Sequence, residues 1–156
     1  MPIFIDQGES MGTTSKIKRV HLKISDEHKS VFLGIVFAEP DYKLSLTLNR
    51  YLNISLKNVT PVILDEESGE ELVFSRFSDT SASPGLIYDL ISNRSGKNFL
   101  FKKLKNIDYI FQIHDPENEI NISNIAATLR DIEFITAVFN IDPELMKDKN
   151  LNHLIH

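Results

Sequence analysis

The chain has 156 residues, of which 42% are hydrophobic and 25% are charged, with a formal net charge of −5 and no cysteine. This length and composition are those of one globular domain with its own core. The lack of cysteine excludes disulfides, thiolate nucleophiles and zinc–cysteine sites, and the acidic balance argues against a nucleic-acid-binding protein, which needs a basic face.

The first third of the chain predicts two strands and a helix. Residues 1–15 are expected to be a loose N-terminal tail, with Met11 as an alternative start. Residues 16–24 alternate basic and apolar side chains, as in a strand with one solvent-exposed face, whereas residues 30–39 are almost continuously apolar and predict a strand in the middle of a sheet. Asp41 is expected to cap the helix that follows. The apolar stripe of this helix is Leu44, Leu48, Tyr51 and Leu52.

The middle of the chain predicts strands joined by turns. They are a strand at 58–64, an acidic hairpin tip at 65–71, a strand at 72–79, a loop at 80–85 and a strand at 86–96. Pro61 indicates that the first of these strands either lies at an edge of the sheet or begins near the proline. The acidic tip has five carboxylates without the ordered spacing of a calcium loop, so it is interpreted as a solvated turn.

The last third predicts a second strand–helix–strand unit. This unit covers residues 107–142, with a strand at 107–113, a helix at 123–132 and a strand at 133–142. A short amphipathic helix at 98–106 precedes it, and a C-terminal tail at 146–156 follows it. In the short helix, Leu100, Phe101 and Leu104 face the core and the lysines face solvent. In the first strand, Ile107 is expected on the same face as Tyr109. Either Asn121 or Ser123 can cap the second long helix.

These elements predict a single α+β domain over residues 16–145. It consists of a largely antiparallel sheet covered on one face by helices, on a ferredoxin-like or ACT-like plan with an inserted hairpin. In this arrangement the apolar stretches at 31–37, 107–113 and 134–141 lie side by side. The helical segments at 42–52 and 123–132 cover them.

The tripeptide Ile107-Asp108-Tyr109 is the most specific feature of the sequence. It resembles the end of the signature Ile-Pro-Glu-x-x-x-Val-Asp-Tyr, which names the IPExxxVDY family of bacterial proteins. The stretches that are also similar to this family are 41–49, 74–79 and 131–144. Phe101-Lys102-Lys103 stands where the family has Ile-Pro-Glu, which argues against a catalytic role for that half of the signature. The resemblance covers most of residues 20–150, and it implies kinship without implying an activity. The last third also resembles the ACT domain, a small regulatory ligand-binding fold.

Arg94 and Ser95 are candidate anion-binding residues, because they precede Gly96, Lys97 and a short predicted helix. Backbone N–H groups at the beginning of a helix bind anions. A turn from a strand to a helix needs such residues in any case, so a structural role is the alternative.

Asp108, Tyr109 and His114 are the other candidate binding residues. Asp108 is either a ligand or interface contact, or it caps or pairs with Lys105 or another group at a helix end. Tyr109 either belongs to the same contact or lies in the core with its hydroxyl hydrogen-bonded. His114 precedes Asp115 at a strand end, where it is either placed for proton transfer or is simply a polar exit from the strand.

No catalytic residue, metal site or cofactor is predicted. The sequence has no Gly-x-Gly, no Gly-x-Ser-x-Gly and no pair of histidines four residues apart. It also lacks a secretory signal and a run of apolar residues long enough to span a membrane. The chain is therefore expected to be cytoplasmic.

Two hypotheses about function remain open. The first is a non-enzymatic binding or protein-interaction module, which forms a homo-oligomer or binds a protein partner through a sheet edge or a helix face. The second is a small enzyme or an anion-ligand binder that uses the loops near Arg94 and His114. The first hypothesis predicts an exposed apolar patch, and the second predicts a concave polar pocket with perturbed titrating groups.

Overall fold

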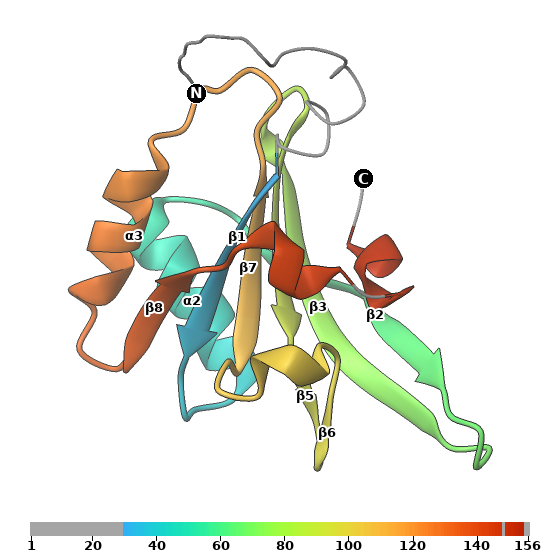
Figure 1. The fold of residues 1–156 in the computed structure, drawn as a ribbon. Coiled ribbons are helices and arrows are strands. Elements are labelled where there is room, and N and C mark those ends of the chain that lie inside the picture. The colour runs from blue at the N-terminus through green and yellow to red at the C-terminus, as the bar shows by residue number, and fades with distance from the viewer. Residues whose placement is uncertain (1–29, 148, 155–156) are drawn as a thin grey trace, which may run out of the picture.

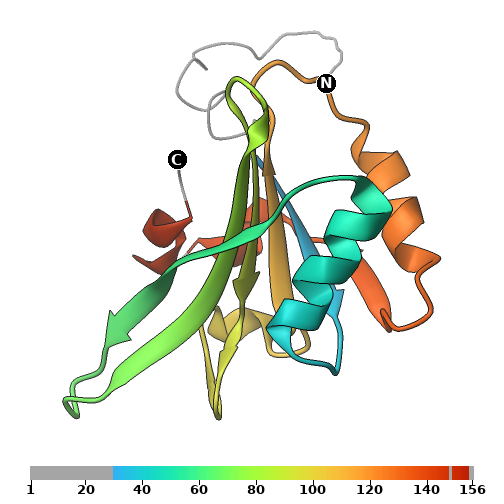
Figure 2. The same ribbon diagram turned by 180° about the vertical axis from the view of Figure 1, so that it is seen from behind.

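The computed structural model describes residues 30–147 and 149–154. The predicted tail at 1–15 and the predicted strand at 16–24 lie outside the described residues. Figures 1 and 2 show a twisted sheet with two helices on one face. Its six strands lie in the order β2-β3-β4-β7-β1-β8 and every pair is antiparallel, which confirms the α+β class.

The strands of the main sheet are β1 (Ser30–Val36), β2 (Lys57–Asp65), β3 (Glu71–Ser83), β4 (Leu86–Ser92), β7 (Tyr109–His114) and β8 (Ala137–Asn140). The remaining elements are the helices α2 (Asp41–Leu52) and α3 (Ile122–Arg130), the short strands β5 (Arg94–Ser95) and β6 (Asn98–Phe99), and the 3-10 helices η2 (Lys102–Leu104), η3 (Pro143–Met146) and η4 (Lys149–His153). No helix within the described ranges has the length and apolar character needed to cross a membrane.

Strand β1 lies inside the sheet, as its continuous apolar sequence predicts. It pairs with β7 on one side and with β8 on the other, so that Leu33 is opposite both Phe111 and Asn140. Phe32 and Leu33 are both buried but belong to different cores, one on each face of the sheet. The prediction that the three apolar stretches are neighbours in one sheet is confirmed.

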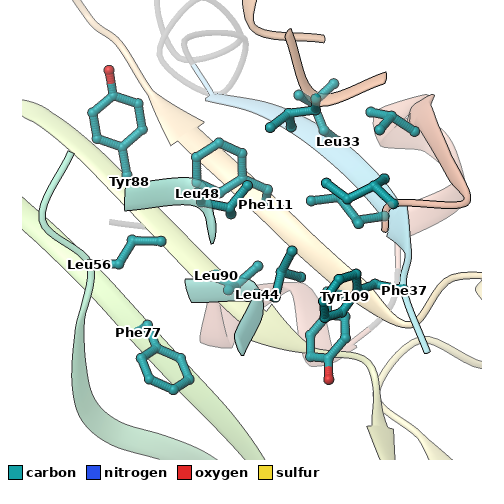
Figure 3. Packing of buried hydrophobic residues seen from close by; sticks show 14 of the residues in the cluster. Leu33, Phe37, Leu44, Leu48, Leu56, Phe77, Tyr88, Leu90, Tyr109 and Phe111 are labelled. Carbon is teal, nitrogen blue, oxygen red and sulfur yellow. The ribbon is translucent and has the colours of Figure 1, made fainter. Parts of the chain in front are cut away.

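The face of the sheet that carries α2 and α3 holds the first core (Figure 3). Its residues are Leu33, Ile35, Phe37, Leu44, Leu48, Leu56, Phe77, Leu86, Tyr88, Leu90, Tyr109, Phe111, Ile113, Leu129, Ile132, Ile135 and Val138. Leu44 and Leu48 come from α2, and Leu129 comes from α3. The prediction that both helices cover the same face is confirmed.

Two details of helix α2 differ from the prediction. Pro40, not Asp41, is the N-cap of α2. Asp41 is the first helical residue, where its carboxylate interacts favourably with the positive end of the helix dipole. Tyr51 does not belong to the buried stripe; it is exposed, and the guanidinium carbon of Arg50 lies 5.9 Å from its ring centroid. For α3, the predicted cap Asn121 is confirmed, since its side chain accepts a hydrogen bond from the backbone of Asn124.

The opposite face of the sheet holds a second core, which irregular segments cover. Its residues are Phe32, Val62, Phe74, Ile91, Leu100, Phe101, Leu104, Ile107, Ile110, Ile141, Met146 and Leu154. Met146 and Leu154 belong to the segment 146–156, which the sequence predicts to be a tail. The side chains of both residues are buried against this face.

Asn93 organises the segment that links β4 to β7. Its side chain is fully buried; it donates hydrogen bonds to the carbonyl oxygens of Leu104 (2.9 Å) and Ile107 (3.0 Å) and accepts one from the backbone of Phe101 (2.9 Å). These bonds hold the segment in β6 and a single turn of 3-10 helix, so the predicted amphipathic helix at 98–106 is wrong in type. Its apolar side, with Leu100, is nevertheless buried as predicted.

Four strand predictions need correction. The strand predicted at 86–96 ends at Ser92, and residues 94–95 form β5 in a separate two-stranded sheet. Strand β3 continues through residues 80–83, which were expected to be a loop, because Ser83 still pairs with Leu86 across the turn at Gly85. Strand β7 begins only at Tyr109, so Ile107 packs on the second core, on the face opposite to Tyr109. Strand β8 is shorter than the predicted 133–142. The ferredoxin-like and ACT-like plans stay a prediction, which the order β8-β1-β7-β4 supports.

Replacing Gly34 with alanine is expected to lower the free energy of unfolding by about 1–3 kcal/mol, because the second core leaves no room for a methyl group. A Cβ at Gly34 would lie 2.7 Å from Cδ1 of Ile107 and 3.1 Å from Cδ1 of Ile141. Urea denaturation would measure the loss. The change Ile107→Val removes that Cδ1, so the double variant should lose less than the sum of the two single losses. Strictly additive losses would contradict this contact.

Candidate functional site

The carboxylate of Asp108 joins three parts of the chain at the beginning of β7. Its Oδ1 lies 2.6 Å from Nε of Arg94, and its Oδ2 accepts a hydrogen bond of 2.9 Å from the backbone of Phe37. Its own backbone N–H donates to the carbonyl oxygen of Ile35, and its carbonyl oxygen accepts from Asn93. Asp108 therefore fixes the end of β4 and the end of β1 to the beginning of β7. Its charge partner is Arg94, whereas the sequence suggested Lys105 or another group at a helix end.

Tyr109 lies in the first core, and its hydroxyl is bonded at the core's boundary. The hydroxyl donates a hydrogen bond of 3.0 Å to the carbonyl oxygen of Glu39, two residues before α2, and the ring packs edge-on against Phe37. Burial, and then the negative charges of Asp41 and Asp108, raise the pKa of Tyr109 to about 12. The hydroxyl thus stays protonated and continues to hold the segment between β1 and α2.

The raised pKa of Tyr109 predicts a loss of stability at high pH. An unfolded tyrosine has a pKa of about 10, so above that pH the unfolded chain binds fewer protons than the folded chain and stability falls until the folded pKa of about 12. Urea denaturation at several pH values between 8 and 12 would measure this slope. Tyr109→Phe should be less stable at pH 8 by about 1 kcal/mol, because it lacks the bond to Glu39, and its slope should be shallower.

Tyr42→Phe is the matched control for that experiment, because its ring is exposed. It should leave the slope unchanged. Equal slopes for wild type and Tyr109→Phe would contradict the assignment of the pH dependence to Tyr109.

Arg94 and Ser95 lie in a two-stranded ribbon and not before a helix. Strand β5 pairs with β6 around Gly96, whose φ of +61° suits the tight turn. Two donors of the Arg94 guanidinium are engaged inside the protein, by Asp108 and by the carbonyl oxygen of Lys105 at 3.0 Å, and its ring contact is Phe99, with a centroid 4.7 Å away. Arg94 and Ser95 therefore do not precede a helix as predicted, and an anion-binding role for them stays a prediction.

His114 is the last residue of β7, six residue steps from Asp108, which is roughly 20 Å along an extended strand. Its Nδ1 lies 2.9 Å from Oγ of Ser30, its neighbour on β1. The two carboxylate oxygens of Asp115 accept hydrogen bonds from the backbone N–H groups of Glu119 and Ile120. The structure therefore brings Arg94, Asp108 and Tyr109 together and leaves His114 apart.

A buried polar group beside His114 was not found by sequence reasoning. Gln112 is fully buried; its Nε2 lies 3.3 Å from Oγ of Ser30, and its Oε1 has no hydrogen-bond partner among the described residues. Asp89, opposite Gln112 on β4, is 1% exposed and lies 3.3 Å from Nε of Arg76. The sequence does place polar residues at inward-facing positions of apolar strands, and this could have indicated them. Burial of a polar group without a hydrogen bond there lowers the stability of the fold.

The hairpin of β2 and β3 exposes apolar side chains where a folded sheet is normally polar. We call residues 61–75 the hairpin arm; it extends past α2 in Figure 2, which looks onto the helix-covered face, and no helix lies over it. Val62 pairs with Phe74, and both belong to the second core. The next pair, Ile63 and Val73, points to the opposite face because side chains alternate along a strand, and these residues are 44% and 48% exposed. We call this pair the arm face.

The described part of the chain was also compared with the ligand sets of metal sites. It contains no group of three or more histidine and acidic side chains that could hold a metal ion. Comparison with known proteins adds no relative: no family model matches the chain, and neither the curated proteins nor the solved structures contain a significant match.

Proposed function

We propose that this chain is a non-enzymatic protein-interaction module of the cytoplasm and that its partner binds on the arm face. The observation that carries the proposal is that the strands of the arm have the sequence of buried strands, whereas one face of the arm is exposed. Each strand of the arm has three consecutive apolar residues, 62–64 and 72–74, as strands buried on both faces do. One face of the arm packs on the second core, whereas Ile63 and Val73 on the other face are about half exposed.

Neither edge of the sheet favours strand addition, so the binding surface is a face. Strand β2 carries Pro61 and an irregular register between Val59 and Val62, both of which interrupt pairing along an edge. Strand β8 has only four residues, and the carbonyl oxygen of its Val138 already accepts from Nε and Nη2 of Arg130. The side chains of the arm therefore support binding better than the backbone of an edge does.

The enzyme hypothesis has less support. It needs Arg94 and His114 in one pocket, but Arg94 in β5 pairs with Asp108 just before β7 begins, whereas His114 is the last residue of β7. Asp108 and Tyr109 make hydrogen bonds inside the protein that explain their presence without a ligand. A binding role for Arg94, Ser95, Asp108, Tyr109 or His114 stays a prediction.

Membership of the bacterial IPExxxVDY family, with an ACT-like fold, also stays a proposal. The tripeptide Ile107-Asp108-Tyr109 supports it, because each residue has a specific structural task. Ile107 fills the second core, Asp108 binds the backbone of Phe37, and Tyr109 binds the backbone of Glu39. A signature that maintains the junction of two strands and a helix would be expected in a family united by its fold.

The proposal is tested by capture of proteins from a lysate by three immobilised forms of the chain. These are wild type, the arm variant Ile63→Thr/Val73→Thr, and the control Phe134→Ser, which removes a side chain that is 71% exposed elsewhere. A protein retained by wild type and Phe134→Ser but lost by the arm variant supports the proposal. A set of captured proteins that does not differ among the three forms overturns it. Light scattering of the three purified forms in solution reports whether the partner is a second copy of the chain.

A further inference from the structure

The two residues of the arm face lie on the hairpin of β2 and β3, which continues the sheet beyond the helices that cover it. On this side of the sheet, α2 and α3 cover the first core, and the helices end before they reach the arm (Figure 2). A helix packed beside α2 would continue the same layer, because helices bury their apolar stripe against a sheet face. The geometry therefore suits a helix as the covering element.

The charge of the arm defines the charge of that helix. Asp65, Glu66, Glu67, Glu70 and Glu71 lie in the turn and at the adjoining strand ends, and no basic residue occurs between positions 58 and 75. The tip is exposed, and Gly69 closes it with a φ of +87°. Carboxylates within a Debye length, about 8 Å at physiological salt, attract a positively charged partner and repel an acidic one.

We propose, on the basis of the proposed function above, that the arm face binds a basic amphipathic helix of a partner protein. The apolar stripe of this helix packs on Ile63 and Val73, which are direct neighbours across the two strands. Lysine and arginine residues beside the stripe reach the carboxylates of the tip. The apolar pair supplies the contact area, and the carboxylates select the sign of the charge.

The test uses synthetic peptides of 18 residues and the full-length chain. The first peptide places leucine at positions i, i+4, i+7 and i+11 on an alanine and lysine background, which is long enough for a helix. The second replaces lysine by glutamate, and the third alternates valine and lysine to favour a strand. Fluorescence anisotropy of the labelled peptides, titrated with protein at two salt concentrations, measures binding.

The lysine helix is expected to bind wild type, and higher salt should weaken this binding. Ile63→Thr/Val73→Thr should weaken it by at least about tenfold, because two half-exposed apolar side chains lose their contact area. Threonine keeps β-branching, so the strands are retained. Glu67→Gln/Glu70→Gln should weaken binding by about two- to tenfold and reduce its salt dependence. Phe134→Ser should bind as wild type does.

Four results would overturn the proposal. They are a lack of binding to the lysine helix, equal binding of the glutamate helix, equal or tighter binding of the strand-forming peptide, and binding that the arm variant does not weaken. Self-association of wild type that the arm variant abolishes would also overturn it, in favour of a second copy. If a lysate protein depends on the arm while the lysine helix does not bind, the proposed function stands and the class of partner is wrong. If the lysine helix binds through the arm while no lysate protein depends on it, the proposed function fails instead.

Discussion

Asn93→Ala is expected to lower the free energy of unfolding by about 3–5 kcal/mol, the largest single effect that we predict for this chain. The side chain is 0% exposed and makes three hydrogen bonds to backbone groups of the segment between β4 and β7. Alanine would leave the carbonyl oxygens of Leu104 and Ile107 and the N–H of Phe101 without these partners. Chemical denaturation would measure the loss, and hydrogen exchange would show the amide of Phe101 losing protection.

Two variants make the Asn93 experiment specific. Asn98→Ala changes the same residue type at an exposed position of β6 and should stay within about 0.5 kcal/mol of wild type. Asn93→Asp keeps the acceptor for Phe101 but places a carboxylate against two carbonyl oxygens, which raises its folded pKa. Its stability relative to wild type should therefore improve below the unfolded pKa of about 4 and worsen as the pH rises. A loss below about 1 kcal/mol in Asn93→Ala would contradict the role of Asn93 as the organiser of this segment.

Asp108→Ala is expected to lower the free energy of unfolding by about 2–3 kcal/mol. The variant removes the acceptor of the Phe37 N–H, which lies between β1 and α2, and the ion pair with Arg94. The first loss is the larger, because Arg94 is 44% exposed on its side chain and solvent-exposed pairs contribute about 0–1 kcal/mol. Thermal and urea denaturation would measure the change.

The Asp108 series separates a structural role from a binding role. Asp108→Asn can still accept from Phe37 and should lose only about 1 kcal/mol, close to the loss of Arg94→Met. A residue selected for ligand binding usually costs stability, so its removal is neutral or stabilising. A stable Asp108→Ala would contradict the structural role and would favour the binding role predicted for Asp108. The backbone N–H of Asn93 donates to the backbone carbonyl oxygen of Asp108, so the two residues are in direct contact. The stability losses of the Asn93 and Asp108 variants should therefore not be additive.

The regular elements were predictable where one local pattern decided the structure. The continuous apolar run of β1 and the stripe of Leu44 and Leu48 in α2 follow from burial alone. Of the two positions that Pro61 allows for β2, an edge or a strand start, the structure shows the edge. These signals depend on a few neighbouring residues. The second core was not predictable as a unit, because Met146 and Leu154 lie in short irregular segments that have no periodic pattern.

The geometry of the candidate site depends on contacts that no local pattern encodes. Lys105 is closer to Asp108 in sequence than Arg94 is, yet Arg94 makes the ion pair because the ribbon of β5 and β6 places it beside the beginning of β7. The helix expected at 98–106 has the right amphipathic sequence, but the buried side chain of Asn93 binds its backbone in another conformation. Tertiary hydrogen bonds therefore outweigh local propensity in this segment.

The position of β1 has a consequence for the order in which the chain acquires its structure. Both neighbours of β1, the strands β7 and β8, come from residues 109–140, although β1 ends at Val36. A ribosome that adds about 5–20 residues per second needs several seconds to synthesise the intervening chain. During that time the apolar residues of β1 have no partner strand, so this segment is the expected target of chaperones during translation.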